Sequence, residues 1–260
     1  MKLKILIFAG LLMMTHLGIA QEKALSNDLS TVLKKGQKEY PLFGVKRIGI
    51  GHDMELQVHP LLFFLDPHIG LKKYWGNKNK WHISSRHTLN YPTILLKTIS
   101  REGTGGVLPK TSVIPQIFST KNEIQVAKAL GDQFRFTAIL GLELAATLGD
   151  SDFPTIDLPF AYRRTAVYHD HFLPYFGLQL EGDLTPELKY ELAFTAYKIM
   201  NDTGGFTFED KVILYWKKSR KFGLKAGLAS AFGKYPFGND IRWMPLVDFV
   251  WTVGSRVMKI

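Results

Sequence analysis

The sequence predicts an all-β fold, an antiparallel transmembrane β-barrel of about 10–12 strands preceded by an N-terminal signal peptide. Three features predict it. They are a long segment that alternates apolar and polar residues, several shorter segments of the same kind separated by turn residues, and a basic and then apolar start to the chain. Strands with this pattern present one face to lipid and the other to water.

The clearest strand is predicted for Gln133–Leu148. Every second residue is apolar, and this face consists of Phe134, Phe136, Ala138, Leu140, Leu142, Leu144, Ala146 and Leu148. The opposite face mixes charged and small residues, namely Arg135, Thr137, Gly141, Glu143, Ala145 and Thr147. A period of two belongs to a strand rather than a helix. An apolar face of this length favours a barrel wall between lipid and a wet lumen.

The first 20 residues have the pattern of a secretory signal peptide. Lys2 and Lys4 precede an apolar run from Ile5 to Met14, and small residues follow as far as Ala20. This order is typical of signal peptides, and the apolar run is too short to cross a bilayer as a helix. We expect cleavage after Ala20.

Residues 21–44 are expected to be a loose periplasmic lead-in segment, because they offer no wide apolar face and no firm helix cap. The barrel is predicted for residues 45–260, and 113–130 holds either one strand or two. Strands are expected at or within Val45–Phe64, Ile69–Trp75, Trp81–Leu89, Thr93–Ser100, Val113–Leu130, Gln133–Leu148, Phe160–Tyr168, Tyr175–Gly182, Leu188–Tyr197, Phe206–Trp216, Phe222–Phe232 and Ile241–Val257.

Turn residues separate the predicted strands. Gly76–Lys80 and Asn201–Gly205 are short polar turns, whereas Arg101–Lys110 and Gly149–Pro159 are longer loops. Alternation of short turns and longer loops is typical of outer-membrane barrels, whose short turns face the periplasm. The aromatic residues that flank turns, as in an interfacial girdle, are Tyr74, Trp75, Trp81 and Tyr91.

Charge and composition exclude several functional classes. The formal net charge of +10 includes Lys2 and Lys4, so it falls by two, to +8, in the predicted mature chain. A basic excess suits nucleic acid, anionic lipid head groups or an anion-preferring lumen, and the signal peptide argues against nucleic acid. The chain has no Cys, which excludes a lipoprotein anchor, disulfides and thiolate metal sites.

From the signal peptide to the aromatic-rich last strand, the chain resembles small bacterial outer-membrane β-barrel proteins. The resemblance covers Val45–Ile260 and rests on the alternating strands, with Trp251 and Val253 in the alternation of the last one. It implies a nearly or fully monomeric protein of the cell outer membrane of a Gram-negative bacterium. It also implies outer-membrane lipid, lipopolysaccharide and the barrel-assembly machinery as partners.

Charged residues on the predicted inward faces make the lumen the first candidate site. These residues are Arg135, Glu143, Glu181, Lys189, Glu191 and Lys225. Opposite charges across a narrow barrel more often pair than select a solute, and side chains fill much of a lumen of about ten to twelve strands. The sequence is therefore compatible both with a closed barrel and with an open channel.

The histidines suggest two hypotheses, a metal site and a hydrolase site. His169 and His171 would share one side of an extended chain, as metal ligands do, although no third ligand lies nearby. His82 and Ser84 lie two residues apart on a predicted strand. This pair resembles the His and Ser that outer-membrane lipid A deacylases and phospholipases carry on the outer wall, which implies a lipid hydrolase.

The favoured function is non-enzymatic, either a narrow pore or transporter-like channel for small solutes, or an envelope-structural barrel. No cofactor is predicted, and the solute is not identified. One alternative is an outer-membrane lipid hydrolase that uses His82 and Ser84. The other is a secreted soluble β-barrel or sandwich that binds an apolar ligand, in which the apolar faces would line a core.

Overall fold

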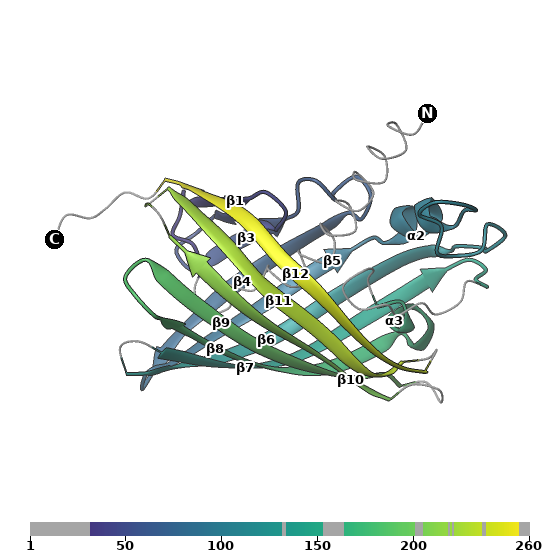
Figure 1. The fold of residues 1–260 in the computed structure, drawn as a ribbon. Helices are drawn as coiled ribbons and strands as arrows, with labels where there is room; N and C mark the ends of the chain where they lie inside the picture. Colours follow the sequence, from purple (N-terminus) through teal and green to yellow (C-terminus); the bar gives the residue numbers. More distant parts are fainter. Residues whose placement is uncertain are drawn as a thin grey trace.

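The computed structural model describes residues 32–131, 134–152, 164–200, 205–217, 219, 221–235 and 238–254, and for residues 235 and 238–240 only the backbone. The predicted signal peptide at residues 1–20 lies outside the described part. Twelve antiparallel strands form a closed barrel (Figure 1). Each strand pairs with the next along the chain, and β1 pairs with β12 to complete the circle.

Nine of the strands are long, and the first three are short. A strand of about 9–11 residues crosses a bilayer when it is tilted, so the long strands have the required length. The strands are β1 Lys38–Pro41, β2 Lys46–Gly49, β3 Met54–Val58, β4 His68–Lys78, β5 Trp81–Asn90, β6 Gln116–Leu130, β7 Phe134–Leu148, β8 Phe172–Asp183, β9 Leu188–Lys198, β10 Phe206–Trp216, β11 Phe222–Tyr235 and β12 Gly238–Val253.

The two ends of the barrel differ in their connections. At the end where β1 begins and β12 ends, here the terminal end, the connections are 50–53, 79–80, 131–133, 184–187 and 217–221. At the opposite end, here the loop end, they are 42–45, 59–67, 91–115, 149–171, 199–205 and 236–237. The long connections thus gather at one end of the barrel, as the sequence pattern predicts.

Two segments predicted as strands are helical. Thr93–Ile99 forms α2 rather than a strand, and its buried Leu95, Leu96 and Ile99 follow helical rather than alternating spacing. Pro92 directly precedes the helix. Ala166–Asp170 forms α3, whose buried Ala166, Val167 and Tyr168 are consecutive. The rest of the predicted strand Phe160–Tyr168 is not strand where it is described, and residues 160–163 lie outside the described part.

Several strand assignments also differ from the prediction. β1 lies within the segment expected to be a lead-in, so the barrel begins at Lys38 rather than Val45. Four-residue strands are too short to produce a readable alternation. Residues 113–130 hold a single strand, β6, and β12 begins at Gly238, three residues before the prediction. Among the described residues, no helix is long and apolar enough to cross a membrane.

Candidate functional site

The two faces of the barrel wall have opposite chemistry. On β7, Thr137 is fully buried and Leu140 is 67% exposed, and on β12 Trp243 is 65% exposed. Gln179 of β8 is 1% exposed. A soluble barrel would place its apolar side chains inward. The apolar faces instead form the exterior, which contradicts the alternative of a soluble protein with an apolar core and fits a lipid-facing wall.

All six charged residues predicted to line the lumen occupy inward positions of their strands. Four ion pairs involve five of them: Arg135–Glu181 at 2.9 Å, Lys189–Asp183 at 2.7 Å, Glu191–Lys211 at 2.5 Å and Lys225–Glu39 at 3.9 Å. Glu143 lies opposite Lys121 of β6 in the strand register. The side chains of Lys189 and Asp183 are about half exposed, whereas that of Lys211 is only 7% exposed. The lumen is therefore wet at the terminal end of β8 and β9.

A buried hydrogen-bond network centres on Glu123 of β6. Arg86 of β5 donates to both of its carboxylate oxygens at 2.8 Å, through Nε and Nη2. Tyr175 of β8 and Gln125 of β6 donate to the same carboxylate at 2.7 and 2.8 Å. A bidentate guanidinium and two further donors satisfy a charge that would otherwise be costly to bury.

Aromatic stacking extends this network across the lumen. The rings of Tyr175 and Tyr197 are stacked, with centroids 5.2 Å apart. Tyr197 Oη donates to Glu209 at 3.4 Å, and Arg164 Nη2 donates to the same carboxylate at 2.6 Å. The guanidinium carbon of Arg164 also lies 4.1 Å from the Tyr197 ring centroid. Polar and aromatic contacts thus run from β5 to β10 through the barrel interior.

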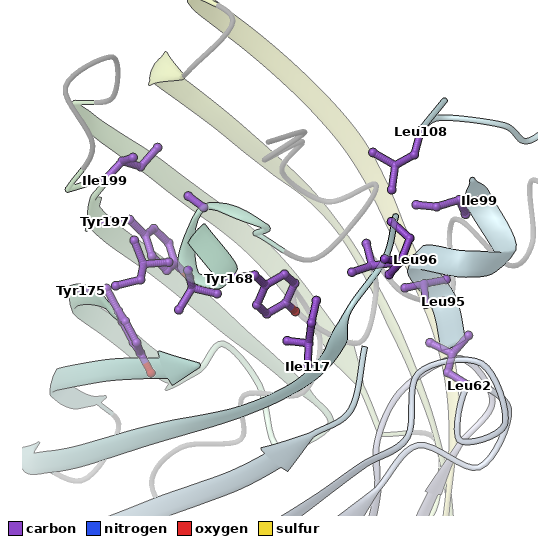
Figure 2. Close-up of a cluster of buried hydrophobic side chains, with 14 of the residues drawn as sticks. Leu62, Leu95, Leu96, Ile99, Leu108, Ile117, Tyr168, Tyr175, Tyr197 and Ile199 are labelled. Atoms are coloured by element: carbon purple, nitrogen blue, oxygen red, sulfur yellow. The ribbon is translucent and has the colours of Figure 1, made fainter. Parts of the chain in front are cut away.

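Arg164 belongs to the connection between β7 and β8, and the described residues 164–171 of this connection fold into the lumen. The α3 residues that follow it pack against inward side chains of the wall, as Figure 2 shows for Tyr168 and Ile117. Val167, Ile117 and Ile199 are completely buried. The apolar cluster continues to α2 and to Leu62 of the β3–β4 connection. Apolar packing therefore occupies the lumen at the loop end.

A second charged cluster lies where the short strands meet. Arg47 of β2 donates to both oxygens of Glu55 of β3 at 3.0 and 2.8 Å, and Gln57 donates to Glu55 at 2.6 Å. Leu33 N also donates to this carboxylate at 2.9 Å. Glu55 therefore ties the chain preceding β1 to the inner face of the wall.

His82 and Ser84 do not have the geometry of an outer-wall hydrolase. Both are at inward positions of β5, where His82 Nδ1 lies 3.1 Å from Tyr74 Oη and Ser84 Oγ donates to Gln125 at 3.2 Å. The pair therefore faces the lumen rather than the lipid. The alternation of β5 explains the error, because two residues two apart share a face without indicating which face it is.

His169 and His171 are not brought together as metal ligands. His169 lies in α3, and His171 ends that helix with a left-handed backbone at φ 61°. Positions two apart on a helix point to nearly opposite sides, unlike those of an extended chain. The described residues contain no group of three His, Asp or Glu side chains placed to hold a metal ion.

Sequence reasoning missed the buried residues Arg86, Glu123 and Arg164. Arg86 and Glu123 could have been found, because each is a charge at an inward position of an alternating strand. Arg164 could not, because a predicted strand was assigned where the chain turns into the lumen.

No protein-family model matches the chain, and no curated protein matches it. Among solved structures, the chain is similar to the NanC porin, with a TM-score of 0.47 and 7% identity over 83% of this chain and 95% of that one. It is also similar to the outer-membrane protein OmpT of Vibrio cholerae, with a TM-score of 0.44, 7% identity and coverage of 80% and 62%. OccK11 (OpdR) of Pseudomonas aeruginosa follows at 0.38, with 13% identity and coverage of 80% and 52%.

Proposed function

We propose that this protein is an integral outer-membrane β-barrel that forms a narrow pore for small hydrophilic solutes and has no enzymatic role in its lumen. Its short connections would face the periplasm and its long ones the outside, as is usual for such barrels. Lipid and lipopolysaccharide would contact the outer wall, and the barrel-assembly machinery would insert the chain. A single barrel closes without a partner, which supports a monomer.

The observation that carries the proposal is the gradient of hydration along the lumen. The terminal-end pairs Lys189–Asp183 and Arg135–Glu181 of β7, β8 and β9 are partly exposed, whereas Arg164–Glu209 is buried nearer the loop end, where residues 164–171 enter the lumen. A polar vestibule leading to a constriction is the geometry of a selective pore. Because the described inward charges pair with one another, we expect weak discrimination between anions and cations.

Arg164 is the residue to test, because it holds the inserted connection against β10. Its guanidinium contacts both Glu209 and the ring of Tyr197. Arg164→Ala removes both contacts, so the connection should leave the lumen more often and conductance should rise several-fold. Single-channel recording in planar bilayers measures this.

Arg135→Ala is the matched control, because Arg135 pairs with Glu181 near the mouth of the lumen at the terminal end, opposite the end that carries the β7–β8 connection. Its conductance should stay close to that of the unmodified protein. If neither the unmodified protein nor Arg164→Ala conducts, the pore proposal fails and an envelope-structural barrel is the better explanation.

A further inference from the structure

The strands form a closed circle, but the wall is low where the first strand meets the last. β1 pairs only with Val250–Val253 of β12, whereas β12 continues toward the loop end as far as Gly238 (Figure 1). Within the described part of the chain, no strand pairs with Ile241–Val247 on the β1 side. We call the part of the wall beside this edge the notch. A strand edge without a partner is costly at membrane depth, so the notch requires an explanation.

The edge of β12 at the notch is poorly suited to pairing with a further strand. Pro245 lies in the middle of this edge, is exposed, and has no N–H to donate. Proline occurs at strand edges, where it prevents another strand from adding to the sheet. The notch is therefore a break in the strand ladder rather than a docking site for a strand.

Two connections lie at the notch. The backbone N–H groups of Leu42 and Phe43 donate to Asp248 Oδ1 at 2.9 and 3.0 Å, which ties the β1–β2 connection to β12. His59 Nε2 lies 2.9 Å from Phe43 O, and His59 Nδ1 accepts from Leu62 N at 3.2 Å, which ties the β3–β4 connection to the first. Both connections therefore shield the edge next to Asp248, and one carboxylate and one imidazole hold them there.

The β3–β4 connection exposes apolar side chains beside the notch. Phe64 is 82% exposed and Leu61 is 59% exposed, and Phe63 is exposed next to them. Leu62 instead belongs to the buried apolar cluster with Leu95 of α2 (Figure 2). Large apolar side chains gathered at an exposed surface mark contact with membrane. The outer side of the notch is therefore lined by side chains suited to lipid.

The inner face of the wall beside the notch is apolar as well. Inward positions such as Gln125 of β6 and Gln179 of β8 carry polar side chains. Met244 and Leu246 of β12 are also inward and buried, but they are apolar. Their cluster includes three inward residues of β10 and β11, namely Ile213, Ala229 and Ala231. Apolar surfaces thus lie on both sides of the notch.

We propose that the notch is a lateral portal, through which molecules with a flexible apolar chain pass between the lumen and the surrounding lipid. Such a chain would keep apolar contacts from Phe64 on the outer side to Leu246 on the inner face. Opening requires the loss of a few hydrogen bonds around Asp248 rather than the separation of two long strands. This function goes beyond the proposed pore, whose solutes would move along the barrel axis.

Cysteine labelling tests the portal, because the chain has no Cys of its own. The probe is N-dodecylmaleimide, a single-chain amphiphile, added to dioleoylphosphatidylcholine vesicles that contain the purified protein, and intact mass records the adduct. Leu246→Cys reports arrival at the inner face. Val247→Cys, on the outer face, shows that the probe reaches the wall. Gln179→Cys is the matched inner site, because Gln179 is 1% exposed, as Leu246 is, but lies on β8.

The expected result is selective labelling beside the notch. Combining Leu246→Cys with Asp248→Ala should speed its labelling about fivefold or more, because losing a hydrogen bond changes an opening equilibrium by such a factor. Asp183→Ala is the control for Asp248→Ala, because it removes a carboxylate that pairs with Lys189 at the terminal end, and it should leave the labelling of Leu246→Cys unchanged. A maleimide that bears a sulfonate should gain no acceleration, because the route is apolar.

Three results would overturn the proposal. The first is unchanged labelling of Leu246→Cys in the Asp248→Ala background while Val247→Cys reacts. The second is equal acceleration of Gln179→Cys, which would mean that the whole barrel loosens. The third is equal acceleration with the sulfonated maleimide, which would mean that the probe arrives through water in the lumen.

Discussion

At the scale of single residues, the Glu123 carboxylate is the central acceptor of the buried hydrogen-bond network. Its side chain is 2% exposed and accepts from Arg86, Tyr175 and Gln125. Glu123→Ala leaves the Arg86 guanidinium buried without its main counter-ion. We expect a loss of about 3–5 kcal/mol in the free energy of unfolding, because an uncompensated buried charge is strongly destabilising. Urea unfolding in detergent micelles, followed by tryptophan fluorescence, measures it.

Glu181→Ala serves as the control for Glu123→Ala, because Glu181 also pairs with an arginine but in the wetter part of the lumen. The Arg135 side chain is 35% exposed there. An exposed ion pair contributes only about 0–1 kcal/mol, so this variant should unfold almost as the unmodified protein does. Equal losses in the two variants would contradict the view that burial distinguishes the two pairs.

Gly141 is required by the position of the Tyr175 ring. A Cβ atom at Gly141 would clash with the Cζ, Cε2 and Oη atoms of Tyr175, which lies opposite it in the register. Gly141→Val should push Tyr175 away from Glu123 and cost about 1–3 kcal/mol, as overpacking does. Thermal unfolding measures the effect. Gly51→Ala is the comparison, because its nearest atom is Met54 Cβ at an ordinary 3.7 Å, and it should change stability little.

At the residue level, the alternation of side chains along a strand predicts which residues share a face of the wall, but not which residues they contact. Once β7 and β8 are recognised, the alternation along each strand places Arg135 and Glu181 on the same side of the wall. The alternation does not predict that the two side chains pair at 2.9 Å, because pairing depends on the register between the strands. For β5, the alternation alone does not determine whether Ser84 or Ser85 lies on the lipid-facing side.

At the scale of elements, the β1–β2 hairpin depends on one carboxylate of β12. Asp248 Oδ1 accepts from the backbone N–H groups of Leu42 and Phe43 at 2.9 and 3.0 Å. Asp248→Ala leaves the Phe43 N–H without this acceptor, whereas the Leu42 N–H also donates to Phe249 O at 2.9 Å, and we expect a loss of about 1–3 kcal/mol in the free energy of unfolding. Hydrogen exchange followed by mass spectrometry should show faster exchange in 38–49. Asp248→Asn keeps an acceptor oxygen and should exchange nearly as the unmodified protein does, and equally fast exchange in both variants would contradict this role.

Which elements were predictable depended on their length and environment. β7 was predicted within a residue, because fifteen residues of alternation leave no ambiguity of period. β1 was missed, and β2 was predicted within Val45–Phe64 but not separated from β3, because four residues carry too few alternations. α2 was mistaken for a strand because its apolar face packs against Leu62 and Leu108, residues distant in sequence that no local pattern reveals. Tertiary packing, rather than local preference, decides such short helices.

At the scale of the whole molecule, closure between β1 and β12 turns a sheet with two edges into a barrel with none. Unpaired edge groups are not tolerated in the hydrocarbon region, so this seam determines whether the chain can reside in a membrane. The seam consists of only four residue pairs, from Lys38 opposite Val253 to Pro41 opposite Val250. Only the β1–β2 pairing, with two residue pairs, is shorter than the seam, and the seam joins residues distant in sequence.

A disulfide across the seam tests closure directly, because the chain has no cysteine of its own. Lys38→Cys combined with Val253→Cys places two thiols on paired residues, where Cα atoms about 4.5–5.5 Å apart suit a disulfide. After oxidation and boiling without reductant, the cross-linked chain should migrate faster on a denaturing gel than after reduction. Lys38→Cys combined with Phe206→Cys is the control, because Phe206 pairs with β9 rather than β1 and should form no intramolecular disulfide. Cross-linking in both variants or in neither would contradict the strand order, whereas cross-linking at the seam alone requires the first and last strands to be neighbours.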